Sequence, residues 1–318
     1  MLTTFALYSD RFFLAAVTVY LLAMVLHGWE FARERSAAPA LVGAGTDSAG
    51  TDPAGTDASV TPATRRTRAE RRGRMGVSLV VLGALLQLAS IVLRGFATQR
   101  WPLGNMYEFV SMITFAAVVT WLVVLYRSAG RSPSLRPLGA FVLFPVLVLM
   151  FLAGTVLYVA AAPVMPALQS YWLAVHVSAV SLASGLFFVP GVASVLHLML
   201  RAGRMPAALA RTLPSAEALD RLAYRVTIIA FPLYTFAIIA GAIWAEAAWG
   251  RFWGWDPKET VAFVAWVIYA AYLHARATAG WRTGRAAWIN VLGFAVIIFN
   301  LFFINMVVAG LHSYAGLN

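Results

Sequence analysis

Apolar stretches of about 20 residues recur from one end of this sequence to the other, separated by short polar segments. A stretch of this length can cross the hydrocarbon core of a bilayer, about 30 Å thick, as an α-helix. Strands of about ten residues with alternating polarity, which are typical of a transmembrane barrel, are not found in the sequence. The pattern therefore predicts an all-α integral membrane protein with eight transmembrane helices. The predicted spans are roughly 11–29, 75–94, 107–126, 138–160, 171–200, 225–244, 258–276 and 288–310.

Composition agrees with this prediction. Of the 318 residues, 61% are hydrophobic and 12% are charged, whereas soluble domains carry about 25% charged residues. No small-residue cleavage site follows the first apolar stretch, so we expect that stretch to be retained as a span. The sequence contains no cysteine, which excludes disulfides, thiolate metal ligands and a thiol relay within this chain.

The distribution of basic residues predicts the orientation. Segments after the first, third, fifth and seventh predicted spans hold 19 of the 24 Lys and Arg residues. Basic residues collect in cytoplasmic loops, so we expect both the N-terminus and the C-terminus outside. The net charge of +11 is thereby explained without nucleic acid. We expect a multi-pass protein of the cell (plasma) membrane, surrounded by membrane lipid, whose active face is extracytoplasmic.

These patterns divide the chain into three predicted parts. Residues 1–30 form the first transmembrane helix. Residues 31–74 form an Arg-rich cytoplasmic linker, which we expect to be disordered because 36–64 hold almost no large apolar side chain. Residues 75–318 form a seven-helix domain with an external Trp-rich loop at 245–260.

That external loop is unusually aromatic. Trp249, Phe252, Trp253 and Trp255 fall within seven residues. An aromatic belt at the headgroup level is the simpler interpretation, but belts place only one or two rings at each helix end. Two glycines in the loop would let a flat object approach the backbone closely. We therefore expect a flat apolar ligand here.

The end of the loop also carries a helix-start signal. Asp256 is a candidate N-cap, followed by Pro257 at the first helical position and Glu259 at the third. This interpretation competes with a direct ligand role for Asp256. Asn105 and Glu108 repeat the same spacing at the predicted third span.

Two of the five histidines are predicted at the level of this loop. His176 lies in the first turns of the fifth span, and His312 follows the eighth. A lone interfacial histidine is more often a satisfied polar group. Two imidazoles beside an aromatic platform, however, suit the two axial positions of a haem iron.

The other three histidines are predicted near the inner face. His274 lies 15 residues beyond Glu259, about 22 Å below the outer face at ~1.5 Å per residue. Ionisable groups within a membrane are functional candidates, although His274 could instead snorkel to the cytoplasmic interface. His27 and His197 adjoin basic segments, so interfacial positions compete with ligand roles for both.

Several of these segments resemble one family. Trp249-Gly250-x-x-Trp253-x-Trp255-Asp256 resembles the tryptophan-rich, or WWD, signature of the haem-handling proteins of cytochrome c maturation. The CcsA/ResC branch, named CcsB in some lineages, has similar elements, and the resemblance covers roughly 100–318. The similar elements are Asn105-Met106-Tyr107-Glu108, Pro257-Lys258-Glu259-Thr260, Tyr272-Leu273-His274-Ala275-Arg276 and Leu311-His312-Ser313-Tyr314.

The resemblance implies a role in cytochrome c biogenesis system II. His176 and His312 match the family's external haem ligands, and His274 matches its intramembrane histidine. Trp249, Trp253, Trp255 and Asp256 match the segment that presents haem b to the Cys-x-x-Cys-His of an apocytochrome c. The chain would be the haem-presenting subunit of a cytochrome c haem lyase, in complex with a ResB/Ccs1-type membrane partner. The partner or His27 would supply a second inner ligand.

Two alternatives remain at this stage. The first is a haem-handling protein of the CcmC or CcmF type, although the former has six spans and the latter is much longer. The second is a non-haem polytopic transporter, which predicts broken helices and internal symmetry that the sequence does not show. Four outer-face cations are either propionate partners or solvated interfacial charges: Arg94, Arg100, Arg251 and Lys258.

Overall fold

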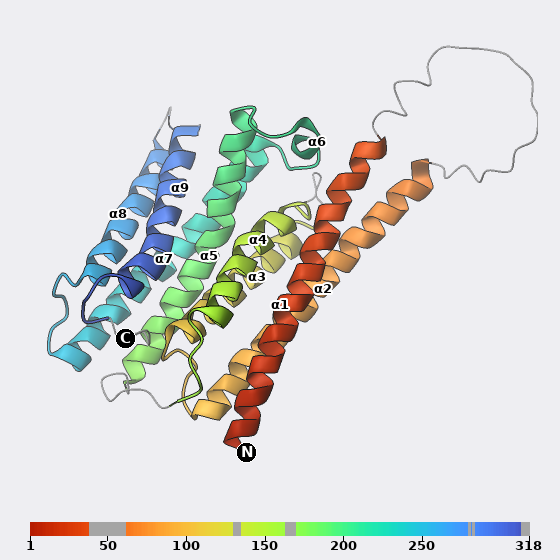
Figure 1. Cartoon of the computed structure of the whole chain (residues 1–318). Coiled ribbons are helices and arrows are strands. Elements are labelled where there is room, and N and C mark those ends of the chain that lie inside the picture. The colour runs from red at the N-terminus through yellow and green to blue at the C-terminus, as the bar shows by residue number, and fades with distance from the viewer. Residues whose placement is uncertain (38–61, 130–134, 163–169, 279–280, 282–283, 313–318) are drawn as a thin grey trace, which may run out of the picture.

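The computed structural model describes residues 1–37, 62–129, 135–162, 170–278, 281 and 284–312. Within these ranges the chain is helical, with turns and loops between the helices (Figure 1). The helices are α1 Leu2–Ala37, α2 Pro62–Thr98, α3 Met106–Arg127, α4 Leu138–Thr155, α5 Tyr171–Arg201, α6 Ala207–Ala210, α7 Ala216–Trp249, α8 Pro257–Ala277 and α9 Gly284–Phe299, which the π-helix η3 Asn300–Ile304 continues.

Eight of these helices are long and apolar enough to cross a membrane. They are the eight spans expected from the hydrophobic pattern, so the all-α, eight-span prediction is confirmed. The chain passes up and down through the bundle, and the start of α1 and the end of η3 lie at the same end (Figure 1). Which end faces outward remains a prediction that rests on the arginine distribution.

The two edges of the linker predicted at 31–74 differ from the prediction. Helix α1 continues to Ala37 and α2 already begins at Pro62. Both edges of the predicted linker are therefore helical, whereas disorder was expected there. Alanine, arginine and glutamate between 63 and 74 favour helix, and a helix that already exists extends at little cost. Residues 38–61 of the predicted linker lie outside the described residues.

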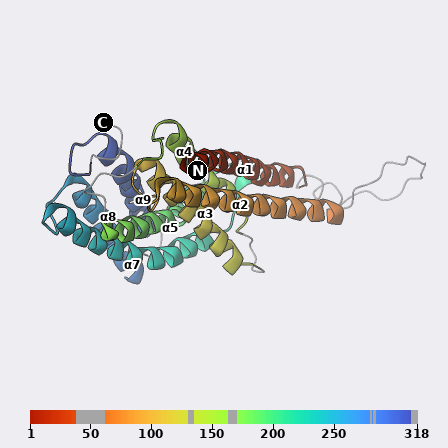
Figure 2. The same ribbon diagram turned by 90° about the horizontal axis from the view of Figure 1, so that it is seen from below.

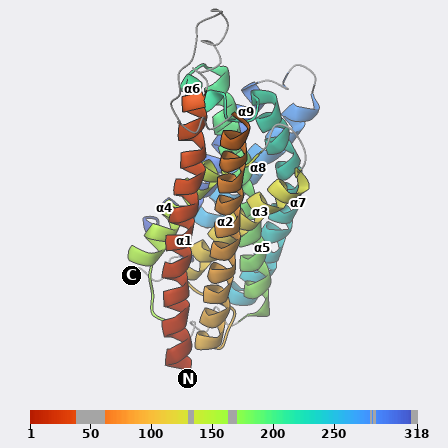
Figure 3. The same cartoon turned by 90° about the vertical axis from the view of Figure 1, so that its right-hand side faces the viewer.

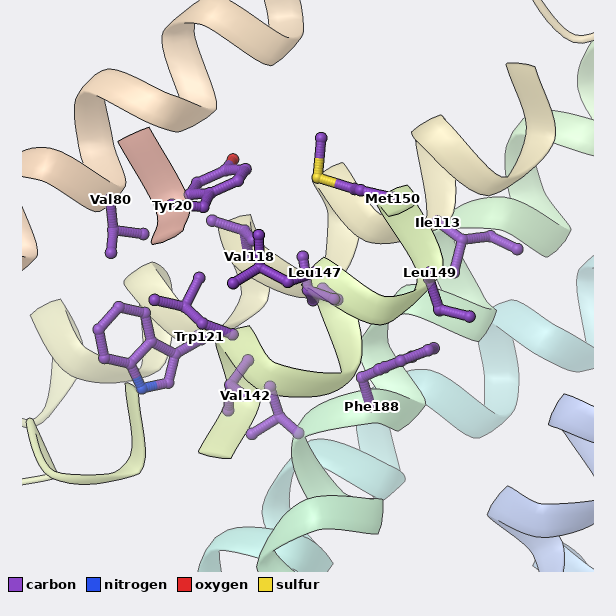
Figure 4. Packing of buried hydrophobic residues seen from close by; sticks show 14 of the residues in the cluster. Tyr20, Val80, Ile113, Val118, Trp121, Val142, Leu147, Leu149, Met150 and Phe188 are labelled. Carbon is purple, nitrogen blue, oxygen red and sulfur yellow. The ribbon is translucent and has the colours of Figure 1, made fainter. Parts of the chain in front are cut away.

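Helix α5 occupies the middle of the bundle. It contacts α3, α4, α7 and α9, and Figure 2 shows it between α3 and α7. A buried cluster that joins α1–α5 includes Tyr20, Trp121 and Phe188 (Figure 4). A second cluster joins α5 to α7, α8 and α9, where the Phe187 and Tyr269 rings stack with centroids 3.9 Å apart. Because α5 belongs to both clusters, the middle of this helix is packed from two sides.

Helices α1 and α2 run side by side along one flank (Figure 3). Polar contacts join them at depths where water is scarce. The Tyr20 hydroxyl donates to Gln87 Oε1 at 2.9 Å, and the Gln87 amide donates to Ser111 and Thr114 of α3. Ser9 and Ser90 each donate to the other's carbonyl oxygen. These bonds tie the first span to the rest of the bundle.

Candidate functional site

A pocket opens at the end of the bundle where α1 begins and η3 ends. The space between its walls is about 1000 Å³, a volume that includes the open mouth. Most of its wall is apolar and comes from α3, α5 and α7. Its aromatic and imidazole groups are His176, Trp244, Trp249, Trp253 and His312. The sequence-predicted outer histidines and two of the three predicted tryptophans therefore meet in one cavity.

His176 is held by the facing helix α7. Its Nδ1 lies 2.8 Å from the carbonyl oxygen of Ala237, and its ring is stacked on Trp244 at an interplanar angle of 3°. A Cβ atom at position 241 would come within 2.6 Å of the imidazole, so Gly241 provides the space that the ring occupies. Because a carbonyl oxygen only accepts, Nδ1 carries the proton. Neutral His176 therefore has its lone pair on Nε2.

His312 is oriented by Asp256. The His312 Nδ1 atom lies 2.8 Å from Asp256 Oδ1, and the Leu311 amide donates to Asp256 Oδ2 at 2.8 Å. The His312 ring contacts Trp249 at 5.1 Å and Trp244 at 5.9 Å between centroids. Both pocket histidines thus flank Trp244, and each holds Nδ1 against an acceptor. This arrangement is usual for metal-ligating histidines.

Asp256 serves the helix start and the histidine at once. It caps α8, and its side chain and that of Glu259 form a reciprocal capping box, as the sequence predicts. Burial alone would raise the pKa of Asp256, but hydrogen bonds from His312, Leu311 and Lys258 lower that pKa to about 2. Burial lowers the pKa of His312 despite its hydrogen bond to Asp256. In neutral solution the pair is therefore a carboxylate and a neutral imidazole.

The aromatic loop divides between the pocket and its mouth. Trp249, Phe252 and Trp253 line the pocket. Trp255 lies outside this lining and is 66% exposed, with its ring 5.7 Å from that of Trp253. Its φ of 57° is unusual for a bulky residue. Thr260 and the capping box hold the adjacent backbone in place.

The two loop glycines both have structural roles. Gly250, with φ of 68°, is the C-cap of α7. Gly254 packs against the Arg251 guanidinium and donates its backbone N–H to Glu259 Oε2 at 2.9 Å. Neither lines the pocket. Both glycines shape the loop, and the approach of a flat ligand to their backbone stays a prediction.

Comparison with known proteins identifies the family. The model of the family described as "Cytochrome C assembly protein" matches residues 103–312. The "Cytochrome c biogenesis protein CcsA" of Guillardia theta is 35% identical over 259 residues, which cover 73% of this chain and 84% of that protein. The protein of the same name from Chlamydomonas reinhardtii is 35% identical over 253 residues, 77% of this chain and 68% of that one. The chain belongs to the CcsA family of cytochrome c assembly proteins.

A solved structure shares the fold of this CcsA-family chain. A "Cytochrome c Heme Lyase CcmF" chain superposes with a TM-score of 0.62 at 18% identity. The match covers 94% of this chain and 46% of that one, so the chain spans about half the length of that protein. Because the identity is low, the likeness supports the eight-span fold alone. The curated relatives favour the CcsA branch among the alternatives left open by the sequence.

Three of the four cations predicted at the outer face are paired with carboxylates. Glu108, which is 3% exposed, binds Arg94 Nε at 3.1 Å and Arg100 at 2.8 Å. Arg251 lies 3.3 Å from Glu259 Oε1. Arg94 and Arg100 therefore fix the start of α3, which forms one wall of the pocket, in place of the predicted propionate or solvated roles. Lys258 is the exception, because none of the ion pairs among the described residues contains it. Its side chain lines the pocket.

The remaining histidines lie away from the pocket. His274 is exposed on α8 near the opposite end of the bundle. His27 is fully buried on α1. A Cβ atom added at Gly76 or Gly139 would lie only 3.1 or 3.0 Å from its ring. Helices α1 and α8 lie on opposite flanks (Figures 1 and 2), so His27 and His274 are not placed to share one iron. His197 donates to the Ala216 carbonyl and joins α5 to α7.

Sequence reasoning missed three pocket residues. Asn305 is a polar residue near the end of an apolar stretch, and that signal alone makes it a functional candidate. Trp244 and Gly241 carry no local signal, since an aromatic residue or a glycine inside a span is ordinary. Their importance depends on the facing helix α5, which places His176 against both.

Proposed function

We propose that the pocket holds haem, with His176 and His312 as the two axial ligands, and presents it for covalent attachment to an apocytochrome c. The observation that carries this proposal is the pair of imidazoles in one pocket, each with Nδ1 held by an acceptor. Neutral imidazoles with an oriented Nε2 lone pair are the usual axial ligands of haem iron. Membership of a cytochrome c assembly family supports the same choice of ligand.

The lining of the pocket meets the chemical requirements of haem. A planar, largely apolar macrocycle requires a wide cavity with aromatic walls, and Trp244, Trp249 and Trp253 supply such walls. The two ligand imidazoles come from different elements, α5 and the segment after η3. Packing and hydrogen bonds fix both rings before any ligand enters, which lowers the cost of ordering the site.

The chain's contribution to attachment is positional. Haem supplies two vinyl groups, and each cysteine thiol of the Cys-x-x-Cys-His motif adds across one of them, with the thiol hydrogen going to the vinyl carbon. His176 and His312 fix the depth and tilt of the ring, and positioning of this kind provides much of such a rate enhancement. Phe252 and Trp255, 59% and 66% exposed, offer an apolar surface at the mouth for the apocytochrome. The histidine of its motif can then replace one pocket imidazole and release the product.

The setting is proposed from the family and the charge pattern. The arginine asymmetry supports an outward-facing pocket in the plasma membrane. The substrate is haem b, and a ResB/Ccs1-type protein completes the synthase, in which this chain presents the haem. Exposed His274 on the α8 flank is accessible to such a partner, which would contribute the second inner ligand.

One experiment tests this function directly. The chain is co-produced with a ResB-type partner and a reporter apocytochrome in a bacterial host without its own synthase. Covalently haem-stained reporter is expected only when both membrane proteins are present, because the proposed pocket must be filled and then presented to the thiols. A reporter whose two motif cysteines are alanine serves as the control. Unstained reporter despite normal membrane levels of both proteins would refute the proposal.

Replacement of Asp256 separates its two roles. In Asp256→Asn the helix cap is retained, because asparagine caps as well as aspartate, but His312 loses its carboxylate partner. We expect haem affinity to fall about 10–100-fold, the usual cost of losing such an orienting group, with little change in thermal stability. Haem titration and a thermal melt measure the two effects. Wild-type affinity in Asp256→Asn would show that Asp256 is a helix cap alone.

A further inference from the structure

Lys258 differs from the other cations near the pocket. Arg94 and Arg100 are bound to Glu108, and Arg251 is bound to Glu259. The Lys258 ammonium instead donates to the amide oxygen of Asn305, which is neutral. Among the ion pairs found within the described parts of the chain, none contains Lys258. Its charge therefore lies at the pocket wall with no carboxylate in direct contact.

The surroundings of Lys258 fix the position of this charge. Asn305 also donates to the Leu301 carbonyl at 2.9 Å, so its amide oxygen is turned toward the lysine. The Lys258 ammonium lies 5.7 Å from the centre of the Phe109 ring, a contact that favours the charged form. Both neighbours belong to the pocket lining, as Lys258 does. A charged group that is buried among neutral groups costs free energy unless an anion binds to it.

We propose that Lys258, held by Asn305, is the carboxylate-binding group of this pocket, so that its ligand is a planar apolar molecule with a carboxylate on one edge. This inference rests on the proposed function, under which the carboxylate is a haem propionate. The propionates and vinyl groups of haem lie on different edges of the ring. A propionate bound at Lys258 therefore also determines which edge is left for the incoming thiols.

A comparison of two ligands tests this inference without altering the protein. The purified complex with its ResB-type partner is titrated with haem and with haem dimethyl ester, which has the same ring and iron but no carboxylate. The ester is expected to bind about tenfold more weakly or worse, since a hydrogen bond to a charged group contributes that much. The low-spin absorption band reports occupancy of the pocket for both ligands.

Variants then assign the preference to one side chain. Lys258→Met should bind haem about tenfold more weakly and no longer distinguish it from the ester. Lys258→Arg should keep the preference because it keeps the charge. Arg251→Gln is the matched control, since it removes a nearby cation that lies outside the pocket lining.

The outcomes are distinguishable. Equal affinity of the wild-type complex for both ligands, with a low-spin spectrum, would overturn the role of Lys258 and leave the haem site intact. An unchanged preference for haem in Lys258→Met would also overturn it. A wild-type complex that forms a low-spin spectrum with neither ligand would overturn the proposed function and this inference together.

Discussion

Proteins in which His176 or His312 is replaced by alanine are expected to retain at most about a tenth of the wild-type haem content. Loss of a group that merely orients a metal ligand costs about 10–100-fold in affinity, and loss of the ligand itself should cost no less. The measurement is haem per purified protein, together with the low-spin absorption band. Added imidazole should partly restore both, because the truncated side chain leaves space in a pocket that is otherwise intact.

Two glycine variants, one a test and the other its matched control, extend this prediction. Gly241→Ala places a methyl group within 2.6 Å of the His176 ring and should reduce haem content in the same direction. Gly284→Ala adds the same methyl group where the nearest neighbouring atom is Leu198 Cδ2 at 3.6 Å, an ordinary contact, and should change nothing. Wild-type haem content in both His176→Ala and His312→Ala would place the site elsewhere in the protein.

The His274→Ala protein is expected to contain an empty pocket although both pocket histidines are intact. His274 lies about 22 Å from Glu259 along α8, too far to bind the same iron. If haem enters from the inner leaflet by way of His274 and the partner, loss of this imidazole stops the supply. The measurement is haem per folded complex after co-production with the ResB-type partner.

Haem added to the purified variants separates supply from binding. The His274→Ala complex should then fill to the wild-type level, because its pocket is unchanged, whereas His176→Ala should remain largely empty. If His274→Ala carries full haem and gives normal cytochrome c yield before any addition, the inner step does not exist. His274 would then be an interfacial residue at the end of α8.

Local signals in the sequence were sufficient for the eight spans and for the caps at the starts of α3 and α8. Apolar length alone predicts all eight spans, because a bilayer requires a fixed helix length. The Asp256 cap and the Asn105 cap are both present, with Asn105 accepting from the Glu108 amide at 2.9 Å. These features depend on neighbours within three or four residues, so the chain itself displays them.

Contacts between distant segments could not be predicted in this way. Glu108 looked like a partner for its own helix end, yet it binds Arg94 and Arg100. The link between Asp256 and His312 joins residues 56 positions apart. Nothing local indicates such pairs, because they depend on which helices pack together. The sequence nonetheless predicts that His176 and His312 lie at one level, because depth in a membrane follows from position along each span. The structure places both in one pocket.

The central claim is that His176 and His312 together bind one haem. The most direct test is the absorption spectrum of the wild-type complex purified with its ResB-type partner, compared with the same complex carrying either alanine substitution. The account predicts a low-spin, six-coordinate haem in the wild type whose band is lost in each variant and returns with added imidazole. A folded wild-type complex without haem, or a low-spin band that is unchanged in both variants, would contradict it.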